Sequence, residues 1–255
     1  MADIFQLANR HALVTGASSG LGRHFAGVLA RTGARVTLAA RREAALSEVV
    51  TSLGSAGPEA HGVRMDVTDA DSIEQAFAAA EARFGPVTIL INNAGVTITR
   101  AALEVEEKDW DSIIGTNLKG AWLVARHAAQ RMVHHAARGS IVNIASILGL
   151  RVAGGVAPYA ISKAGVVQMT KVLALELARH GIRVNALAPG YIETELNDAF
   201  FSSDAGKTLI RRIPQRRLGE VGELDGPLLL LASDAGSYMT GSVVAVDGGH
   251  LVSGL

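Results

Sequence analysis

Short apolar runs alternate with longer stretches of helical spacing along almost the whole chain, and this alternation constrains the fold more than any other feature. The runs are rich in Val, Ile and Leu, and most are apolar without a break, which is typical of strands buried on both faces of a parallel sheet. Helical spacing is clear in Asp69–Phe84 and Lys163–Arg179. Strict alternation predicts a doubly wound α/β sheet with right-handed crossovers. The predicted strands are His11–Thr15, Arg35–Ala39, Ala60–Arg64, Val87–Ile91, Ser140–Ala145, Ile182–Ala188 and Val243–Val246.

Length and composition fit one domain. The 255 residues would suit one large α/β domain or two small ones, but no composition break or linker divides them, so we expect a single domain over residues 1–255. Lys and Arg number 24 and so do Asp and Glu, so the net charge of zero predicts neither a nucleic-acid nor an anionic membrane partner. The absence of cysteine excludes disulfides, thiolate metal sites and cysteine nucleophiles.

The same features predict where the protein works. Residues 1–9 lack the basic segment, apolar run and small-residue cleavage site of a signal peptide. No apolar run approaches the roughly 20 residues needed to span a bilayer. Together with the lack of cysteine, these observations predict a cytoplasmic protein.

A glycine-rich turn follows the first predicted strand, where Thr15–Gly22 reads TGASSGLG. Between a buried strand and a helix, backbone N–H groups of such a turn reach a pyrophosphate, and the helix N-terminus adds a favourable dipole. Gly16 would permit the tight turn, Gly20 close approach of the ligand, and Gly22 close packing of helix on strand. The alternative is an ordinary structural turn, but its place at the start of an alternating chain favours a dinucleotide.

The end of the second predicted strand indicates which dinucleotide. Proteins that bind NAD usually carry an acidic residue there for the ribose hydroxyls, whereas this chain has Arg41 and Arg42. Two guanidinium groups could pair with the 2′-phosphate of NADP. The alternative is two solvated arginines that open a surface helix, where each cation would oppose the helix dipole by about 0.3–1 kcal/mol. The sequence favours NADP, with NAD as the alternative cofactor.

Tyr159 and Lys163 lie four residues apart at the start of a helical stretch, so their side chains share one face. A phenol with a pKa of about 10 is a poor base at neutral pH. An ammonium about 6 Å away, at an effective dielectric constant near 20, would stabilise the phenolate by roughly 3 kcal/mol, or about 2 pKa units. We therefore expect Tyr159 to act as a general acid and base, the alternative being surface packing of a common pair.

Two more polar residues are candidates for the same site. Ser146 follows the strand Ser140–Ala145, at the sheet edge where ligands bind, and its hydroxyl could bind a substrate carbonyl. Its alternative is a loop or capping serine. Asn117 lies within a predicted helical stretch, although asparagine is unfavourable in a helix, and this indicates a functional role for its side chain. Its alternative is a buried asparagine bonded to the backbone.

Taken together, these residues resemble the short-chain dehydrogenase/reductase family over essentially the whole chain. The resemblance implies a single Rossmann-type sheet of seven parallel strands, in the order 3-2-1-4-5-6-7, flanked by helices on both faces. It implies an oxidoreductase that moves a hydride between a nicotinamide cofactor and a ketone or secondary alcohol. The motifs that carry it are TGASSGLG at Thr15–Gly22, NNAG at Asn92–Gly95, Asn117, Ser146, YAISK at Tyr159–Lys163 and PG at Pro189–Gly190.

The resemblance also implies roles for single residues. Tyr159 would be the acid and base, with Lys163 lowering its pKa and holding the nicotinamide ribose, while Ser146 and Tyr159 bind the substrate. Asn117 would hold a water that links Lys163 to a proton relay. Asp66 would bind the adenine amino group. The other residues implied in cofactor binding are Gly16, Ser18, Ser19, Gly20, Leu21, Gly22, Arg41, Val67, Asn93, Ala94, Gly95, Pro189, Gly190, Ile192 and Thr194.

The glycine-rich turn of this chain differs from that of many relatives that use NADP. Many relatives that use NADP carry a basic residue in the glycine-rich turn, whereas this chain has Ser18 and Ser19 there, so the preference for NADP depends on Arg41. We expect no metal site, because His134 and His135 have no third ligand nearby in the sequence.

Two predicted helices, Leu118–Val133 and Lys163–Ala178, are apolar around most of their circumference. Such a helix must be buried on most faces, either by neighbours in the same chain or by another subunit. The resemblance implies a homotetramer, or less often a homodimer, in which these helices meet.

The segment 190–218 is expected to select a small-molecule substrate. Phe200 and Phe201 suggest an apolar lid, and the arginines suggest an anionic substrate such as an acyl carrier or a sugar acid. The alternative is a solvated helix with an inward aromatic pair. Two other functions stay open, a 3-oxoacyl-thioester reductase and a non-catalytic dinucleotide-sensing protein, although such sensors typically lose the tyrosine or the lysine. The arginines are Arg211, Arg212, Arg216 and Arg217.

Overall fold

The computed structural model describes residues 4–54, 59–193 and 201–253. Within them, seven parallel strands form one sheet in the order β3-β2-β1-β4-β5-β6-β7, which confirms the predicted fold and strand order. The predicted strand ends differ from the observed ones by two residues at most, as is usual where a ladder frays. The strands are β1 (His11–Thr15), β2 (Arg35–Ala40), β3 (Ala60–Arg64), β4 (Ile89–Asn92), β5 (Gly139–Ile144), β6 (Ile182–Pro189) and β7 (Val243–Val246).

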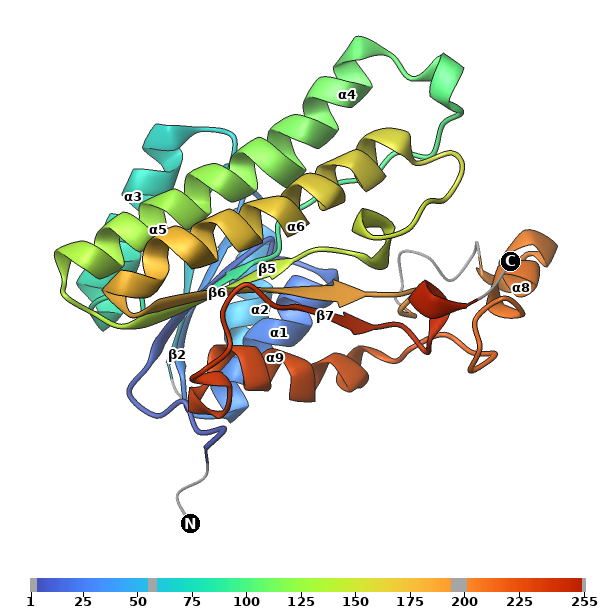
Figure 1. Cartoon of the computed structure of the whole chain (residues 1–255). Coiled ribbons are helices and arrows are strands. Elements are labelled where there is room, and N and C mark those ends of the chain that lie inside the picture. The colour runs from blue at the N-terminus through green and yellow to red at the C-terminus, as the bar shows by residue number, and fades with distance from the viewer. Residues whose placement is uncertain (1–3, 55–58, 194–200, 254–255) are drawn as a thin grey trace.

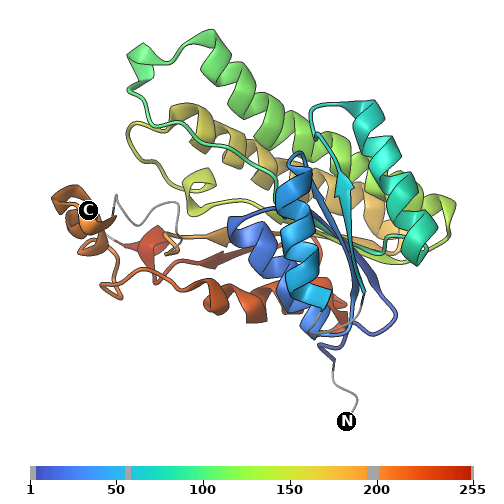
Figure 2. The same cartoon turned by 180° about the vertical axis from the view of Figure 1, so that it is seen from behind.

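Helices cover both faces of the sheet (Figures 1 and 2). Successive strand residues point to opposite faces, so Leu13 packs with α3, α5 and α6 in one core while Val14 packs with α1, α2 and α9 in the other. This double burial explains why the strands read as unbroken apolar runs. The helices are α1 (Gly20–Arg31), α2 (Glu43–Gly54), α3 (Ala70–Phe84), α4 (Glu107–Ile114), α5 (Ala121–His134), α6 (Ala157–Leu177), α8 (Asp204–Ile210) and α9 (Asp225–Ala232).

Helices α5 and α6, which lie next to the site, begin at other residues than the sequence predicts. A single π-helical turn, Gly115–Gly120, joins α4 to α5, so the predicted helix Leu118–Val133 begins inside this wider turn. Helix α6 begins six residues before the predicted start at Lys163, with Pro158 in its first turn, where the fixed φ of proline suits a helix start. Among the described helices, none is long and apolar enough to cross a membrane.

Candidate active site

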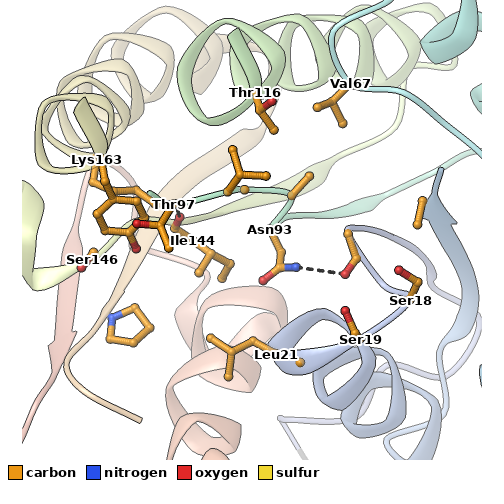
Figure 3. Close-up of a pocket in the computed structure, with 18 of the residues that line it drawn as sticks. Ser18, Ser19, Leu21, Val67, Asn93, Thr97, Thr116, Ile144, Ser146 and Lys163 are labelled. Atoms are coloured by element: carbon orange, nitrogen blue, oxygen red, sulfur yellow. Dashed lines mark hydrogen bonds between the residues drawn. The ribbon is translucent and has the colours of Figure 1, made fainter. Parts of the chain in front are cut away.

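A cleft of about 570 Å³ opens at the carboxyl ends of β1, β2, β4, β5 and β6. This edge is where parallel α/β sheets bind ligands. Figure 3 shows Ser146 and Lys163 at one end of the cleft, Ser18 and Ser19 at the other, and Asn93 between them. The cleft is lined by Gly16, Ser18, Ser19, Gly20, Leu21, Ala39, Ala40, Arg41, Arg42, Met65, Asp66, Val67, Asn93, Ala94, Gly95, Val96, Thr97, Thr116, Ile144, Ala145, Ser146, Tyr159, Lys163, Pro189, Gly190, Tyr191 and Ile192.

The glycine-rich turn has the backbone that its sequence predicts. Gly16 and Gly20 have φ values of +66° and +53°, in the left-handed region that favours glycine. A Cβ on Gly16 would lie 2.9 Å from the Cα of Ala94, and a Cβ on Gly22 would lie 2.3 Å from the carbonyl oxygen of Gly16. Glycine is therefore required at both positions for the close packing of strand, turn and helix.

Side chains at the end of β1 and just after β4 fix this turn against its neighbour. The Thr15 hydroxyl accepts hydrogen bonds from the backbone N–H groups of Asn93 (2.9 Å) and Ala94 (3.0 Å). In return, Nδ2 of Asn93 donates to the carbonyl oxygen of Thr15 at 2.9 Å. The turns that follow β1 and β4 thus form one continuous wall of the cleft.

The two arginines after β2 both line the cleft, and they differ in their contacts. Nη2 of Arg42 donates to the hydroxyls of Ser18 (3.1 Å) and Ser19 (2.9 Å), so its guanidinium lies against the glycine-rich turn. Arg41 is close enough to Asp66 to help lower the pKa of that carboxyl, after the main effect of hydrogen bonding by the Thr68 backbone. Of the two arginines that the sequence suggested for the 2′-phosphate, Arg42 is thus held against the turn by hydrogen bonds.

Tyr159, Lys163 and Ser146 meet at the other end of the cleft, on α6 and just after β5. Ser146 forms a side-chain hydrogen bond with Tyr159 and also caps the short turn that follows it, since its Oγ accepts from the N–H of Leu148 at 3.1 Å. Nζ of Lys163 lies 5.6 Å from the centre of the Tyr159 ring and donates to the carbonyl oxygen of Ile144 at 2.7 Å. The three groups are therefore close enough to act on one ligand.

The pKa values of this group depart from the simple sequence argument. Burial raises the pKa of Tyr159, and the hydrogen bond from Ser146 opposes this effect only in part. Burial also lowers the pKa of Lys163 to about 8. In the protein alone the net pKa of Tyr159 is therefore raised and not lowered, because desolvation penalises the charged form of the phenol, and the effect of Lys163 on this pKa stays a prediction.

Asn117 lies in the π-helical turn, and its carboxamide is fully engaged. Its Oδ1 accepts from the N–H of Val96 at 2.8 Å, while Nδ2 donates to the carbonyl oxygen of Val96 at 2.9 Å and to the hydroxyl of Ser162 at 3.2 Å. The side chain is buried behind the cleft wall rather than in it. Of the two interpretations of this asparagine, the structure supports the buried, backbone-bonded one, and the water-holding role stays a prediction.

The other predicted residues fall into three groups. The remaining predicted cofactor residues line the cleft, with two exceptions. Gly22 packs behind the turn, and Thr194 lies outside the described residues. Phe200, predicted in the substrate segment, also lies outside them. The arginines of the 190–218 segment do not line it, and Arg217 is paired with Glu223 at 2.7 Å. An anion-binding role for that cluster stays a prediction, and Arg217 lines a smaller cavity that shares Tyr191 and Ile192 with the cleft.

Sequence reasoning did not single out Thr97 and Tyr191 as site residues, although both line the cleft. Tyr191 directly follows the Pro189–Gly190 motif, so it carried a local signal. Thr97 follows the NNAG motif by two positions but has a residue type that is common in any loop. Its place in the cleft depends on the path of the chain after β4.

The chain is similar to known proteins over almost its whole length. The family model described as enoyl-(acyl carrier protein) reductase matches residues 16–250. Gluconate 5-dehydrogenase of Gluconobacter oxydans is 39% identical over 252 residues, which cover 98% of each chain. The 3-oxoacyl-(acyl-carrier-protein) reductase of Escherichia coli is 39% identical over 238 residues, covering 93% of this chain and 96% of that protein.

A solved structure shows the same fold. The crystal structure of a gluconate 5-dehydrogenase from Burkholderia cenocepacia, in complex with NADP and tartrate, superposes with a TM-score of 0.94 at 36% identity and covers 99% of both chains. The chain therefore belongs to the short-chain dehydrogenase/reductase family. It is an oxidoreductase of the class that acts on alcohol and carbonyl groups.

Proposed function

We propose that this oxidoreductase binds NADP(H) in the cleft and interconverts a small-molecule ketone and a secondary alcohol. The observation that carries the proposal is that one cleft joins the glycine-rich turn to the group Tyr159, Lys163 and Ser146. The turn fits a pyrophosphate, because it leads into the N-terminus of α1 and a Cβ placed on Gly20 would meet no protein atom within 4 Å, so the backbone there is open to a ligand. NAD is the alternative cofactor.

Arg41 and Arg42 support NADP over NAD. The guanidinium of Arg42 is held by two serine hydroxyls beside the turn, where the 2′-phosphate of NADP would meet it. Asp66 and Val67 would border the adenine, and Lys163 would hold the nicotinamide ribose. The gluconate 5-dehydrogenase from Burkholderia cenocepacia, a relative of the same fold, was crystallised in complex with NADP, which supports this assignment.

The residues of the chain would handle the proton. When bound, the cofactor supplies or accepts a hydride at the reacting carbon. During reduction, the Tyr159 hydroxyl donates its proton to the carbonyl oxygen, and the Ser146 hydroxyl orients that oxygen by a hydrogen bond. The ammonium of Lys163, one helical turn away, stabilises the phenolate that is left. In the direction of oxidation, the phenolate removes the proton of the alcohol.

Removing the phenolic hydroxyl tests this assignment. Tyr159→Phe is expected to abolish turnover, while the affinity for NADPH, measured by fluorescence titration, stays within a few fold. The assay is a panel of ketones, sugar acids and acyl thioesters, each with NADPH and with NADH. Near-normal turnover by the variant would refute Tyr159 as the proton donor.

A 3-oxoacyl-thioester reductase is the second candidate within the enzyme class, because relatives of nearly equal identity are named as gluconate dehydrogenase and as acyl-carrier-protein reductase. Turnover of acetoacetyl-CoA far above that of ketones and sugar acids would favour it. A non-catalytic dinucleotide-sensing protein is the candidate of another class. Binding of NADPH without turnover of any member of the panel would favour that function.

We also propose that the chain forms a homotetramer, or alternatively a homodimer, through α5 and α6. Both helices lie on the same side of the sheet (Figure 1), and both expose large apolar side chains. Leu175 is the most exposed of them, with 82% of its surface accessible. The cytoplasmic location and the single-domain organisation stay predictions from the sequence. The exposed residues are Trp122, Val133, Ile161, Val172 and Leu175.

A further inference from the structure

Tyr191 is the aromatic residue next to the catalytic group whose function the proposed reaction leaves open. It follows the Pro189–Gly190 turn at the end of β6 and lines the same cleft as Tyr159 and Ser146. Its side chain is half-buried, so it is part of the cleft wall and not a surface group.

Two contacts with other rings hold the ring of Tyr191 in place. Its ring centre lies 5.9 Å from that of Phe201, edge to face, and 5.5 Å from that of His250. The backbone is also tied, because the carbonyl oxygen of Tyr191 accepts from the N–H of Gly219 at 3.0 Å. These contacts involve the ring and the main chain, and they leave the hydroxyl free to meet a ligand.

His250, whose ring contacts that of Tyr191, is itself held in place. His250 has only 7% of its surface exposed, and its carbonyl oxygen accepts hydrogen bonds from the guanidinium of Arg151 and from the hydroxyl of Ser253. Arg151 belongs to the loop that follows Ser146, so the C-terminal turn and this loop are joined behind Tyr191. A side chain placed so firmly is preorganised to recognise a ligand.

The hydroxyl of Tyr191 has no hydrogen-bond partner anywhere in residues 4–54, 59–193 and 201–253. Burial raises its pKa, so it stays a neutral phenol that can both donate and accept a hydrogen bond. Two neighbouring hydroxyls at this end of the cleft, those of Tyr159 and Ser146, are assigned to the reacting oxygen. A half-buried polar group in a binding site without a partner in the protein indicates a partner in the ligand.

We propose that the hydroxyl of Tyr191 binds a second oxygen of the substrate, a hydroxyl on the carbon next to the reacting one. The inference rests on the proposed function and narrows it: the enzyme prefers vicinal diols and α-hydroxy ketones to alcohols and ketones without a second oxygen. A site built to bond a substrate hydroxyl discriminates strongly against an analogue that lacks it, because its own polar group is then left unpaired.

The test compares matched substrates and matched variants. Oxidation with NADP is measured for cyclohexanol against trans-1,2-cyclohexanediol and for 2-butanol against 2,3-butanediol. The variant is Tyr191→Phe, which retains the ring contacts with Phe201 and His250. The control is Tyr238→Phe, which removes the same hydroxyl from a fully exposed ring outside the cleft.

The wild-type enzyme is expected to have a kcat/KM at least about tenfold higher for each diol than for the corresponding mono-alcohol. Tyr191→Phe should lower kcat/KM for the diols by about 10- to 100-fold, change that for the mono-alcohols less than about twofold, and so abolish the preference. Tyr238→Phe should change neither.

Three results would overturn the inference in different ways. Equal losses for diols and mono-alcohols would mean that Tyr191 supports the chemistry or the fold in general, and no loss for either would mean that its hydroxyl meets no substrate. A wild-type enzyme without a preference for diols would contradict the substrate class while leaving the proposed function intact. If the wild type oxidised neither kind of alcohol and reduced none of the ketones, sugar acids and acyl thioesters, the proposed function itself would fail.

Discussion

Replacing Arg42 tests how the cleft distinguishes the two nicotinamide cofactors. Arg42 is exposed, yet its guanidinium is fixed beside the glycine-rich turn by the hydroxyls of Ser18 and Ser19, at 3.1 and 2.9 Å. Arg42→Gln retains a polar side chain of similar reach but removes the charge. We expect it to weaken binding of NADPH and to leave binding of NADH nearly unchanged, because only NADPH carries the 2′-phosphate.

The size of the expected change in Kd for NADPH follows from the solvent exposure of Arg42, which would pair with the 2′-phosphate. A hydrogen bond to a charged group contributes about 1.5–3 kcal/mol, and solvent and salt screening at an exposed site favour the lower part of this range. A loss of about 1.5–2 kcal/mol corresponds to about a 10- to 30-fold increase in Kd for NADPH. The Kd for NADH should change less than about threefold, since no charge is lost from its contacts.

The assay is a fluorescence titration of NADPH and NADH into the free enzyme, which needs no knowledge of the substrate. Repeating it at higher salt should shrink the difference between wild type and variant, since screening weakens exposed charge pairs. Arg179→Gln, at an exposed arginine near the end of α6, is the matched control. Equal weakening of both cofactors, or none, would refute the role of Arg42 as a phosphate-binding cation.

A companion substitution addresses the neighbouring arginine. Arg41→Asp should shift the ratio of kcat/KM values towards NADH, because it replaces a cation with a carboxylate that would repel the 2′-phosphate and accept hydrogen bonds from the ribose hydroxyls. An unchanged ratio would show that Arg41 does not contact this part of the cofactor.

Three more predictions follow from single observations. Since burial lowers the pKa of Lys163 to about 8, its ammonium is present below that pH and lost above it, so kcat/KM for carbonyl reduction should fall above pH 8; a rate that stays flat to pH 10 would contradict this. Ala136, two residues after the end of α5, has a φ of +50° and is exposed, so Ala136→Gly should raise the free energy of unfolding by about 1 kcal/mol in urea denaturation, and a destabilised variant would count against the strain argument. Leu175→Lys should shift the protein from the mass of a tetramer towards smaller species in light scattering, whereas Leu103→Lys, at a leucine that is even more exposed, should not; identical masses for both variants would remove α6 from the interface.

Much of the fold and part of the site were predictable because they depend on patterns that are local in the chain. Strands buried on both faces must be apolar at consecutive positions, so the runs around Leu13 and Val14 could be recognised without knowing their partners. The glycines at 16 and 20 are required by backbone conformation alone. Tyr159 and Lys163 share a face because four residues make about one helical turn.

Other features of the site were decided only by the tertiary structure. Arg42 meets Ser18 and Ser19 across more than 20 residues of sequence, and Asn117 uses its carboxamide on Val96 rather than in the cleft. Such contacts depend on how separate elements pack, which spacing along the chain does not reveal.

The same holds for the chemistry of the catalytic group and for Tyr191. The order of residues predicted that an ammonium would stand near a phenol, but burial, which raises the pKa of Tyr159 and lowers that of Lys163, arises from the whole fold around them. Tyr191 comes to face the cleft because Phe201 and His250, one in the substrate segment and one near the C-terminus, enclose its ring. Backbone conformation and helical spacing are properties of neighbouring residues, whereas desolvation and enclosure are properties of everything packed around a group, and only the folded chain determines them.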